Sequence, residues 1–343
     1  MDGVTATAPV REPDEGPGDL LPYRRPSLWR RPSAWLAGLL LLGTSVVLGC
    51  RIADVDGITP VPQLLAFLPW LLAPAALGLL CAGLARWRTG LLWAVVVLGG
   101  LAWYMEPYGK ADDAPGKPFA ELRVMTSNVE FGRGTDGLIK AVKKERPDLL
   151  FVEECDFGCD RKLKKAFEPG VYPYRSAVEA SGAEGSVILS KVPLTKAAGV
   201  PGTLGMPGAV ADVKGEKVRL QLAHPMPPTP GDLGVWRKEL GALREYVESG
   251  GGRSTIVAGD FNATQDHAAF RGVLDAGVRD GSRLAGSSRS PSWPADLPSP
   301  LGAQIDHVLA TKDFAARDAR FLEIGNTDHR ALVLDLTLHR GNG

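Results

Sequence analysis

The sequence predicts an α/β fold in which two β-sheets pack face to face with helices outside them, preceded by three transmembrane helices. The first observation is that three long runs before residue 106 are apolar and almost free of charge. The second is that, from about residue 118, short apolar strands alternate with turns and helical stretches, with too many strands for a helical bundle. The third is that acids, amides and histidines stand at the ends of these strands.

The apolar runs follow a segment, residues 1–32, whose Pro, Gly and charged residues predict a disordered cytoplasmic tail. The runs cover residues 33–50, 61–85 and 89–105. Each is close to the roughly 20 residues that cross a bilayer. Aromatic residues of the kind found at membrane interfaces stand near the ends of the runs: Trp35, Trp87, Trp103 and Tyr104.

Two other interpretations of these runs are disfavoured. A signal peptide would end at a small-residue cleavage site, but none is clear and two more runs follow the first. Core helices of a soluble protein are disfavoured because the runs are almost uncharged and lie outside the part of the chain that carries the polar motifs. We therefore expect three membrane spans.

Basic residues around the runs predict their orientation. They precede the first run or separate the second from the third: Arg24, Arg25, Arg30, Arg31, Arg86 and Arg88. The loop 51–60 instead holds one Arg against Asp54 and Asp56. Basic loops stay in the cytoplasm, so the N-terminus is expected there. An odd number of spans then places the linker 106–118 and the polar domain 119–340 outside the cytoplasmic membrane.

The cysteines fall into two groups. Cys50 and Cys81 lie in apolar runs, where a thiol usually acts as a small hydrophobic group. Cys155 and Cys159 lie four residues apart in the polar domain, and in an oxidising compartment they are expected to form a disulfide. A zinc site is less favoured, because no second Cys/His pair stands nearby at zinc spacing.

The charge of the chain is balanced, with 39 basic and 39 acidic residues. Counting along the sequence, residues 110–343 carry 31 of each. A protein that grips long polyanions usually has a basic surface, so no stable nucleic-acid partner is expected. This argues only mildly against nucleic acid, because some nucleases are not basic.

The polar domain combines strand-like segments with helical stretches at 135–146 and 235–249. Polar residues fall at or just beyond the ends of the apolar segments: Asn128, Glu154, His224, Asp260, Asn262, Asp306, Asp328 and His329. Taken alone, any one of these groups is best interpreted as a turn, for example Gly-Asp-Phe-Asn at 259–262. Repeated at several strand ends, these residue types indicate a shared site at a sheet edge.

These residues carry a resemblance to a known family. The ordered blocks "TSNVEFG", "PDLLFVEEC", "GSVILSKVPL", "LAHP", "VAGDFNATQD", "IDHVLAT" and "NTDHRALVLDL" resemble the endonuclease/exonuclease/phosphatase superfamily over about residues 120–338. The resemblance implies a DNase I-like four-layer α/β sandwich and divalent-metal-dependent hydrolysis of phosphate esters. The N-terminal spans also resemble those of the membrane-anchored bacterial branch that includes the teicoplanin-resistance protein VanJ.

The resemblance implies a role for each matching residue. Glu154 would bind the metal, with Asn128 and Asp328 nearby. Asp260 would activate the attacking water and Asn262 orient it. His329, in the last block, would act as the catalytic histidine and Asp306 would orient it. His224 would be directed at the phosphate.

The chain departs from the family pattern at three positions. Glu153 stands where many relatives have Gln, and Thr327 stands where Ser is commoner. Glu184 is only a candidate for a second glutamate that some members place before "GSVILS". Three other histidines are expected to be packing residues: His267, His307 and His339.

Carboxylate and amide oxygens suit Mg²⁺, with Mn²⁺ as the alternative. The expected substrate is a phosphorylated membrane lipid, such as the undecaprenyl pyrophosphate carrier of cell-wall synthesis, because the short linker keeps the site near the bilayer and the domain is not basic. The resemblance suggests a link to glycopeptide resistance. The alternatives are a membrane-tethered nuclease or phospholipid phosphodiesterase with the same residues, and a non-catalytic anchored binding module.

Overall fold

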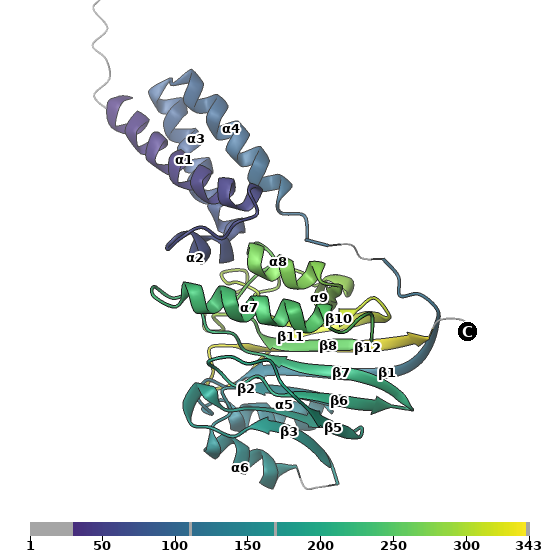
Figure 1. The fold of residues 1–343 in the computed structure, drawn as a ribbon. Helices are drawn as coiled ribbons and strands as arrows, with labels where there is room; N and C mark the ends of the chain where they lie inside the picture. Colours follow the sequence, from purple (N-terminus) through teal and green to yellow (C-terminus); the bar gives the residue numbers. More distant parts are fainter. Residues whose placement is uncertain (1–29, 110–111, 168–169, 341–343) are drawn as a thin grey trace, which may run out of the picture.

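The computed structural model describes residues 30–109, 112–167 and 170–340, and shows a helical region standing on a two-sheet domain (Figure 1). The predicted tail, apart from residues 30–32, lies outside the described residues. The linker ends earlier than expected, because the first strand already begins at Lys117.

The helical region contains α1 (Arg30–Ile52), α2 (Val61–Ala66), a 3-10 turn η1 (Leu68–Leu71), α3 (Leu72–Ala85) and α4 (Arg88–Trp103). Among the described residues, two helical stretches are long and apolar enough to cross a membrane, namely Arg30–Ile52 and Leu68–Ala85. The third predicted span is a shorter apolar helix of 16 residues. The predicted run 61–85 is not one helix. Pro69 follows α2 closely and lacks a backbone N–H, and the chain turns there before α3 begins.

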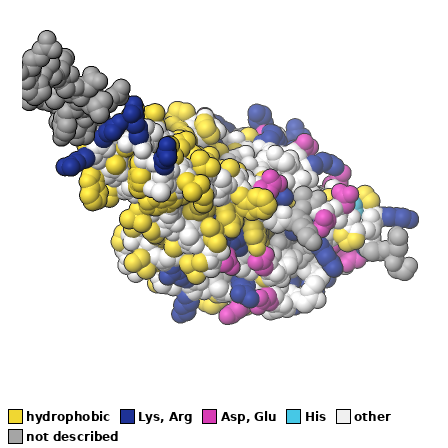
Figure 2. All heavy atoms as spheres, turned by 90° about the horizontal axis from the view of Figure 1, so that it is seen from above, with side chains coloured by type: hydrophobic (Ala, Val, Ile, Leu, Met, Phe, Trp, Pro, Cys, Tyr) yellow, Lys and Arg dark blue, Asp and Glu magenta, His cyan; other side chains and the backbone are white. Residues whose placement is uncertain are grey.

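The helical region exposes much of its apolar surface. Figure 2 shows apolar side chains covering it, with Lys and Arg side chains gathered at one end. Large side chains on all three long helices face outward, including Trp35 at 75% exposure, Leu80 at 60% and Leu92 at 66%. A core helix of a soluble protein would bury most of these side chains.

The described residues from 117 onward build two six-stranded sheets and the helices around them. The first has the order β11-β12-β1-β2-β4-β3 and the second β5-β6-β7-β8-β10-β9. The strands are β1 (Lys117–Asn128), β2 (Leu149–Glu153), β3 (Tyr174–Val178), β4 (Ser186–Ser190), β5 (Leu194–Ala197), β6 (Gly208–Val213), β7 (Glu216–Ala223), β8 (Thr255–Asp260), β9 (Val278–Asp280), β10 (Asp306–Thr311), β11 (Phe314–Glu323) and β12 (Arg330–Arg340).

Helices cover the outer face of each sheet. They are α5 (Thr135–Glu145), α6 (Phe157–Ala166), α7 (Leu233–Glu248) and α8 (Ala268–Asp275). The short α9 (Gly281–Leu284) follows β9 and contacts strands of both sheets, and a 3-10 turn η2 (Gly182–Glu184) precedes β4. Side chains of α5 and α6 pack on the first sheet and those of α7 and α8 on the second. The predicted four-layer sandwich is confirmed.

The alternation of apolar residues builds these layers. Along β1, Val124 enters the core between the sheets, whereas Met125 enters the core under α5 and α6. Phe151 and Leu150 divide in the same way on β2. Successive side chains of a strand point to opposite faces, so strands apolar at every position are buried on both.

Two parallel pairs at the centres of the sheets bring polar strand ends together. In the first sheet β1 runs parallel to β2, with Asn128 opposite Glu153. In the second, β7 runs parallel to β8, with Ala223 opposite Gly259. A Cβ on Gly259 would lie 2.0 Å from the carbonyl oxygen of Ala223, so only glycine allows this approach.

Candidate active site

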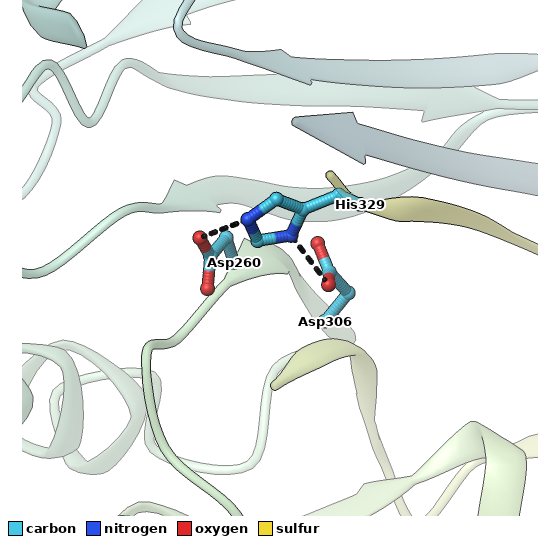
Figure 3. A group of neighbouring side chains, drawn as sticks. All are labelled: Asp260, Asp306 and His329. Atoms are coloured by element: carbon cyan, nitrogen blue, oxygen red, sulfur yellow. Dashed lines mark hydrogen bonds and ion pairs between the residues drawn. The ribbon is translucent and has the colours of Figure 1, made fainter. Parts of the chain in front are cut away.

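Asp260, Asp306 and His329 form the buried centre of the site (Figure 3). Asp260 ends β8 and lies opposite Asp306, which begins β10, while His329 precedes β12 of the other sheet. His329 Nδ1 lies 3.0 Å from Asp306 Oδ2, and its Nε2 lies 3.7 Å from Asp260 Oδ2. The imidazole therefore spans the two carboxylates.

Burial and neighbouring charges shift the titration of this centre. Burial raises the pKa of Asp260 to about 7, against the opposing effect of His329. Burial also disfavours the charged form of His329, but the carboxylates of Asp306 and Asp260 outweigh it and raise its pKa to about 10. A base with a pKa near neutrality beside a charged imidazole is the arrangement that general acid–base chemistry requires.

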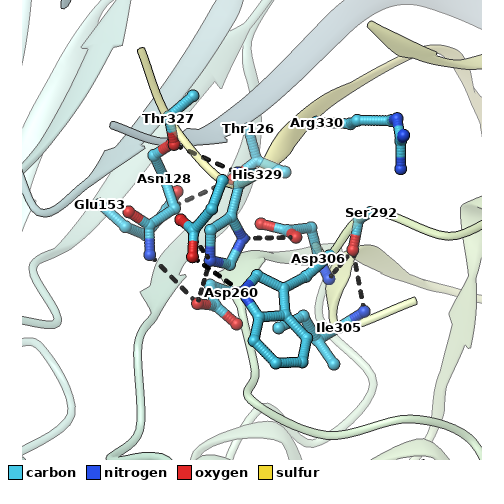
Figure 4. Close-up of polar contacts among 12 residues, drawn as sticks. Thr126, Asn128, Glu153, Asp260, Ser292, Ile305, Asp306, Thr327, His329 and Arg330 are labelled. Atoms are coloured by element: carbon cyan, nitrogen blue, oxygen red, sulfur yellow. Dashed lines mark hydrogen bonds and ion pairs between the residues drawn. The ribbon is translucent and has the colours of Figure 1, made fainter. Parts of the chain in front are cut away.

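Glu154 and Asn128 lie beside this centre. The Asn128 amide nitrogen donates to Glu154 Oε1 at 3.0 Å. It also donates to Asp260 Oδ2 at 3.1 Å (Figure 4). Its Oδ1 accepts from the Glu130 backbone N–H at 2.9 Å. Glu154 Oε2 accepts from the Phe131 backbone N–H at 3.0 Å. As placed, Asn128 joins the two acids through its nitrogen, and the predicted ligand role would require its amide to turn over.

Asp328 lies at the open side of the site. Its carboxylate Oδ1 is 3.8 Å from His329 Nε2, and its Oδ2 accepts a hydrogen bond from the indole of Trp293 at 2.9 Å. The side chain is 41% exposed, whereas that of Asp260 is 2% exposed. An adjoining groove of about 570 Å³ is lined by Glu130, Arg133, Asp296, Asn326, Thr327 and Asp328.

Asn262 and His224 complete the predicted constellation. The Asn262 backbone N–H donates to Asp260 Oδ1 at 2.8 Å, and its side-chain amide donates to the Pro225 carbonyl at 3.0 Å. His224 Nε2 lies 3.8 Å from Glu154 Oε1, and no hydrogen bond to its buried Nδ1 is found among the described residues. Burial, with the nearby charge of His329, lowers the pKa of His224 to about 3, so its ring is neutral. The structure thus brings every predicted site residue into one region.

The donor set of the site fits a divalent cation. Carboxylates crowd together here: Glu130, Glu154, Asp260, Asp306 and Asp328. Arg133 pairs with Glu130, and His329 is the other cation facing them among the described residues. Asp306 Oδ1 has no hydrogen-bond partner within the described chain. Uncompensated carboxylates of this kind hold hard cations. Glu154 and Asp328 are partly exposed oxygen donors and, unlike Glu130, are not paired with an arginine among the described residues.

A second possible ligand group is the buried set of Asp260, Asp306 and His329, whose donor atoms lie within 4.8 Å of one another. His329 already uses Nδ1 toward Asp306, and a metal at the same atoms would displace that contact. We therefore read this group as a carboxylate–imidazole pair with a neighbouring base.

The sequence did not single out several residues that support the site. Glu130 accepts from the Asp328 backbone N–H at 3.1 Å. The Ser292 hydroxyl accepts from the backbone N–H groups of Ile305 and Asp306 (Figure 4). Trp293 lies in a Pro-rich loop, and no local pattern of the sequence connects that loop with the site. Glu130 follows Asn128 by two residues, so its place at a strand end was the signal that could have found it.

Strained backbone marks the same region. Glu130, Phe131, Glu154 and Asn262 all have positive φ, at 46°, 56°, 54° and 48°. This left-handed conformation costs non-glycine residues on the order of 1–3 kcal/mol and clusters at functional sites. The chain turns sharply after β1, β2 and β8, which aims their terminal side chains at one point.

The remaining predicted features lie around the site. Cys155 and Cys159 form a disulfide directly after Glu154. Glu153 is fully buried, and its carboxyl accepts a hydrogen bond from the Thr126 hydroxyl at 3.0 Å. Burial, together with the nearby charge of Asp306, raises the pKa of Glu153 well above the usual value. Glu184 lines a separate groove of about 430 Å³ with Lys196 and Thr203, outside the constellation.

The three other histidines make structural contacts. His307 is buried with Nδ1 2.8 Å from Asp280. His267 is buried with Nε2 2.8 Å from the carbonyl oxygen of Pro62. His339 lies near the end of β12, with Nδ1 3.3 Å from the Gly116 carbonyl.

Comparisons with known proteins agree with this geometry. Residues 125–329, more than half of the chain, match the Endonuclease/Exonuclease/phosphatase family. No curated protein sequence matches the chain.

Solved structures share the fold. A humanized D. rerio TDP2 carrying 14 mutations is 17% identical and covers 63% of this chain and 99% of its own, with a TM-score of 0.53. An endonuclease/exonuclease/phosphatase from Beutenbergia cavernae is 18% identical (64% and 72% covered, TM-score 0.53). An AP endonuclease from Archaeoglobus fulgidus is 18% identical (62% and 98% covered, TM-score 0.51).

The matched segment begins in β1 and ends at His329, so it contains each residue of the site described above. The chain belongs to the endonuclease/exonuclease/phosphatase family and is a metal-dependent phosphoesterase.

Proposed function

We propose that this protein hydrolyses a phosphoric ester or anhydride of a membrane lipid at the outer face of the cytoplasmic membrane, with a lipid-linked pyrophosphate such as undecaprenyl pyrophosphate as substrate. The observation that carries the proposal is the position of the apolar helices beside the site. Phe67, between α2 and η1, packs its ring 6.4 Å from that of Trp293, whose indole binds Asp328. A phosphate on a metal ion held by Asp328 would then be one side chain away from the helical region.

The membrane location is supported by the exposed apolar surface of α1, α3 and α4. Arg30 and Arg31 begin α1, while Arg86 and Arg88 lie between α3 and α4. These basic residues are at the opposite end of the helices from the catalytic domain, which favours a cytoplasmic N-terminus and an external site. The Cys155–Cys159 disulfide suits an oxidising compartment.

The groove beside Asp328 suits a small phosphorylated head group better than a long polyanion. Its charged lining residues are Glu130, Asp296 and Asp328 against Arg133 alone. A nucleic-acid duplex would require basic side chains along its phosphates.

The residues of the site define the chemistry. When bound, Mg²⁺ or Mn²⁺ neutralises charge on the phosphoryl oxygens, with Glu154 and Asp328 as its holders and Asn128 beside them. Asp260, with its raised pKa, accepts the proton of the attacking water. The Asn262 side chain orients that water or the phosphate. His329, kept charged by Asp306, stabilises the developing negative charge.

The test uses the purified full chain with Mg²⁺ and three substrates: undecaprenyl pyrophosphate, sphingomyelin and duplex DNA. We expect phosphate release from the first only, and its loss in His329→Ala. Cleavage of DNA or sphingomyelin with no phosphate from the lipid pyrophosphate would replace the proposal with a tethered nuclease or phosphodiesterase. Absence of all three activities would favour a binding module. A role in teicoplanin or other glycopeptide resistance rests on the first outcome.

A further inference from the structure

The helical region is fixed to the catalytic domain by polar contacts at α8. The two carboxylate oxygens of Asp56, in the loop between α1 and α2, accept from the backbone N–H groups of Ala268 and Ala269 at 2.7 and 3.1 Å. Arg271 Nε donates to Asp54 at 3.1 Å. Backbone N–H groups at a helix N-terminus are otherwise unpaired, so Asp56 supplies the cap that α8 lacks from its own residues.

A second contact reaches the Pro-rich loop 287–303. The Arg289 guanidinium donates to both carboxylate oxygens of Asp266, at 2.6 and 3.0 Å. It also donates to the carbonyl oxygens of Tyr104 and Met105, just beyond α4, at 2.7 and 3.2 Å. One side chain of the loop therefore binds the catalytic domain and the end of the last apolar helix together.

The same loop supplies the contact to the site. Trp293 packs against Phe67 on one side and donates its N–H to Asp328 on the other. Arg330, the residue after His329, also binds the loop: its guanidinium donates to the carbonyl oxygens of Ala295 and Leu297, each at 2.9 Å. The loop thus connects the helical region to the closing acid–histidine pair.

We propose that the docked helical region positions Asp328 through this loop, with Trp293 as the positioning residue and Phe67 as the group that holds its indole. The inference rests on the proposed metal-dependent function, in which Asp328 is a metal holder. Its carboxylate is 41% exposed, and the indole hydrogen bond is the shortest contact described for it. Without that bond the carboxylate is free to rotate into the groove.

Residues that orient a metal ligand typically change metal affinity by about 10- to 100-fold when they are lost. The experiment therefore measures Mn²⁺ binding to the purified full chain in detergent by electron paramagnetic resonance, with no substrate present. Trp293→Phe keeps the ring against Phe67 and removes the N–H. We expect it to weaken Mn²⁺ binding by about 10-fold or more, and Trp293→His, which keeps a ring N–H, to recover part of the loss.

Phe67→Ala tests the coupling to the helical region. We expect weaker Mn²⁺ binding than in the unchanged protein, and no further loss when Phe67→Ala is added to Trp293→Phe, because both act through the same hydrogen bond. Trp35→Phe, on the exposed face of α1, is the matched control and should bind Mn²⁺ normally. Circular dichroism and thermal midpoints confirm that each variant is folded.

Unchanged Mn²⁺ binding in folded Trp293→Phe would overturn the positioning role, and unchanged binding in Phe67→Ala would overturn the coupling. Absence of Mn²⁺ binding by the unchanged protein would overturn the inference as a whole. Weakened Mn²⁺ binding in both variants, together with no hydrolysis of the lipid pyrophosphate, would leave this inference standing and reject the proposed substrate.

Discussion

Asp306 and His329 come from different sheets and meet at 3.0 Å across the end of the sandwich. Asp306 begins β10 of the second sheet, and His329 stands just before β12 of the first. The packing of the two sheets therefore sets the geometry of the carboxylate–imidazole pair. Ser292 fixes the Asp306 backbone from the loop side at 3.1 Å.

Asp306→Asn should impair catalysis while leaving the fold intact. The amide keeps the shape of the side chain but removes the charge that holds His329 protonated and oriented. We expect turnover to fall by about 10²- to 10⁴-fold, as for a general acid–base group that loses its partner. Steady-state assays on the purified full chain measure this, with Asp212→Asn, a half-exposed residue of β6 outside the site, as the control. Turnover within a few fold of the unchanged protein would show that the pair is structural.

Asn128→Asp should separate two roles for this residue. As placed, its amide nitrogen donates to Glu154 and Asp260, so an aspartate would lose both hydrogen bonds and repel both acids. We expect a loss of activity of about 10²-fold even at saturating Mg²⁺. If Asn128 instead binds the metal through oxygen, the substitution supplies a better ligand. Near-native turnover in Asn128→Asp would favour that ligand role.

Much of the sandwich could be predicted from the sequence because its central strands are apolar at nearly every position. The segments that became β2, β4, β8 and β10 are buried throughout. The edge strands gave no comparable pattern. β5 and β11 are largely exposed or half-exposed, so burial selects few apolar residues in them. Pairing with a central strand, which sequence alone does not show, makes them strands.

The site divides in the same way. Residues at the ends of central strands, such as Asn128 and Asp260, were predictable because each stands where a run of apolar residues in the sequence stops. Trp293 was not, because its contacts with Asp328 and Phe67 join segments far apart in the chain. The Asn128 ligand role was inferred from residue type, and only the hydrogen-bond pattern shows which atom faces the acids.

The buried pair of Asp280 and His307 should make stability depend on pH. Burial disfavours both charges, but each partner outweighs it, raising the pKa of His307 above 6.5 and lowering that of Asp280 below 3.8. The His307 contribution is fully present below pH 6.5 and is lost as pH rises through the raised pKa. The Asp280 contribution is present above pH 3.8 and is lost as pH falls through the lowered pKa.

Asp280→Asn keeps a side-chain oxygen that can accept from the Ser282 backbone N–H, and it removes the negative charge that faces His307. We expect a loss of about 3–5 kcal/mol between pH 4 and 6.5, the range in which both partners are charged, and a smaller loss at higher pH. Thermal midpoints across this range measure it, with Glu245→Gln, on the exposed face of α7, as the control. An effect independent of pH would mean that the pair contributes through shape and hydrogen bonding alone.

Asp56→Ala should loosen the helical region from the catalytic domain. The change leaves two backbone N–H groups of α8 without their cap, which typically costs about 0.5–2 kcal/mol. Because Asp56 is 5% exposed, water cannot readily replace it while the domains stay docked. We expect faster limited proteolysis between residues 106 and 116, where the chain joins α4 to β1. We also expect a larger loss of activity on a lipid pyrophosphate in vesicles than on a soluble short-chain pyrophosphate. Glu121→Ala, on the exposed side of β1, should change neither measurement. Equal losses on both substrates would show that undocking disturbs the site itself, as expected if Phe67 and Trp293 position Asp328, and not only its distance from the bilayer surface.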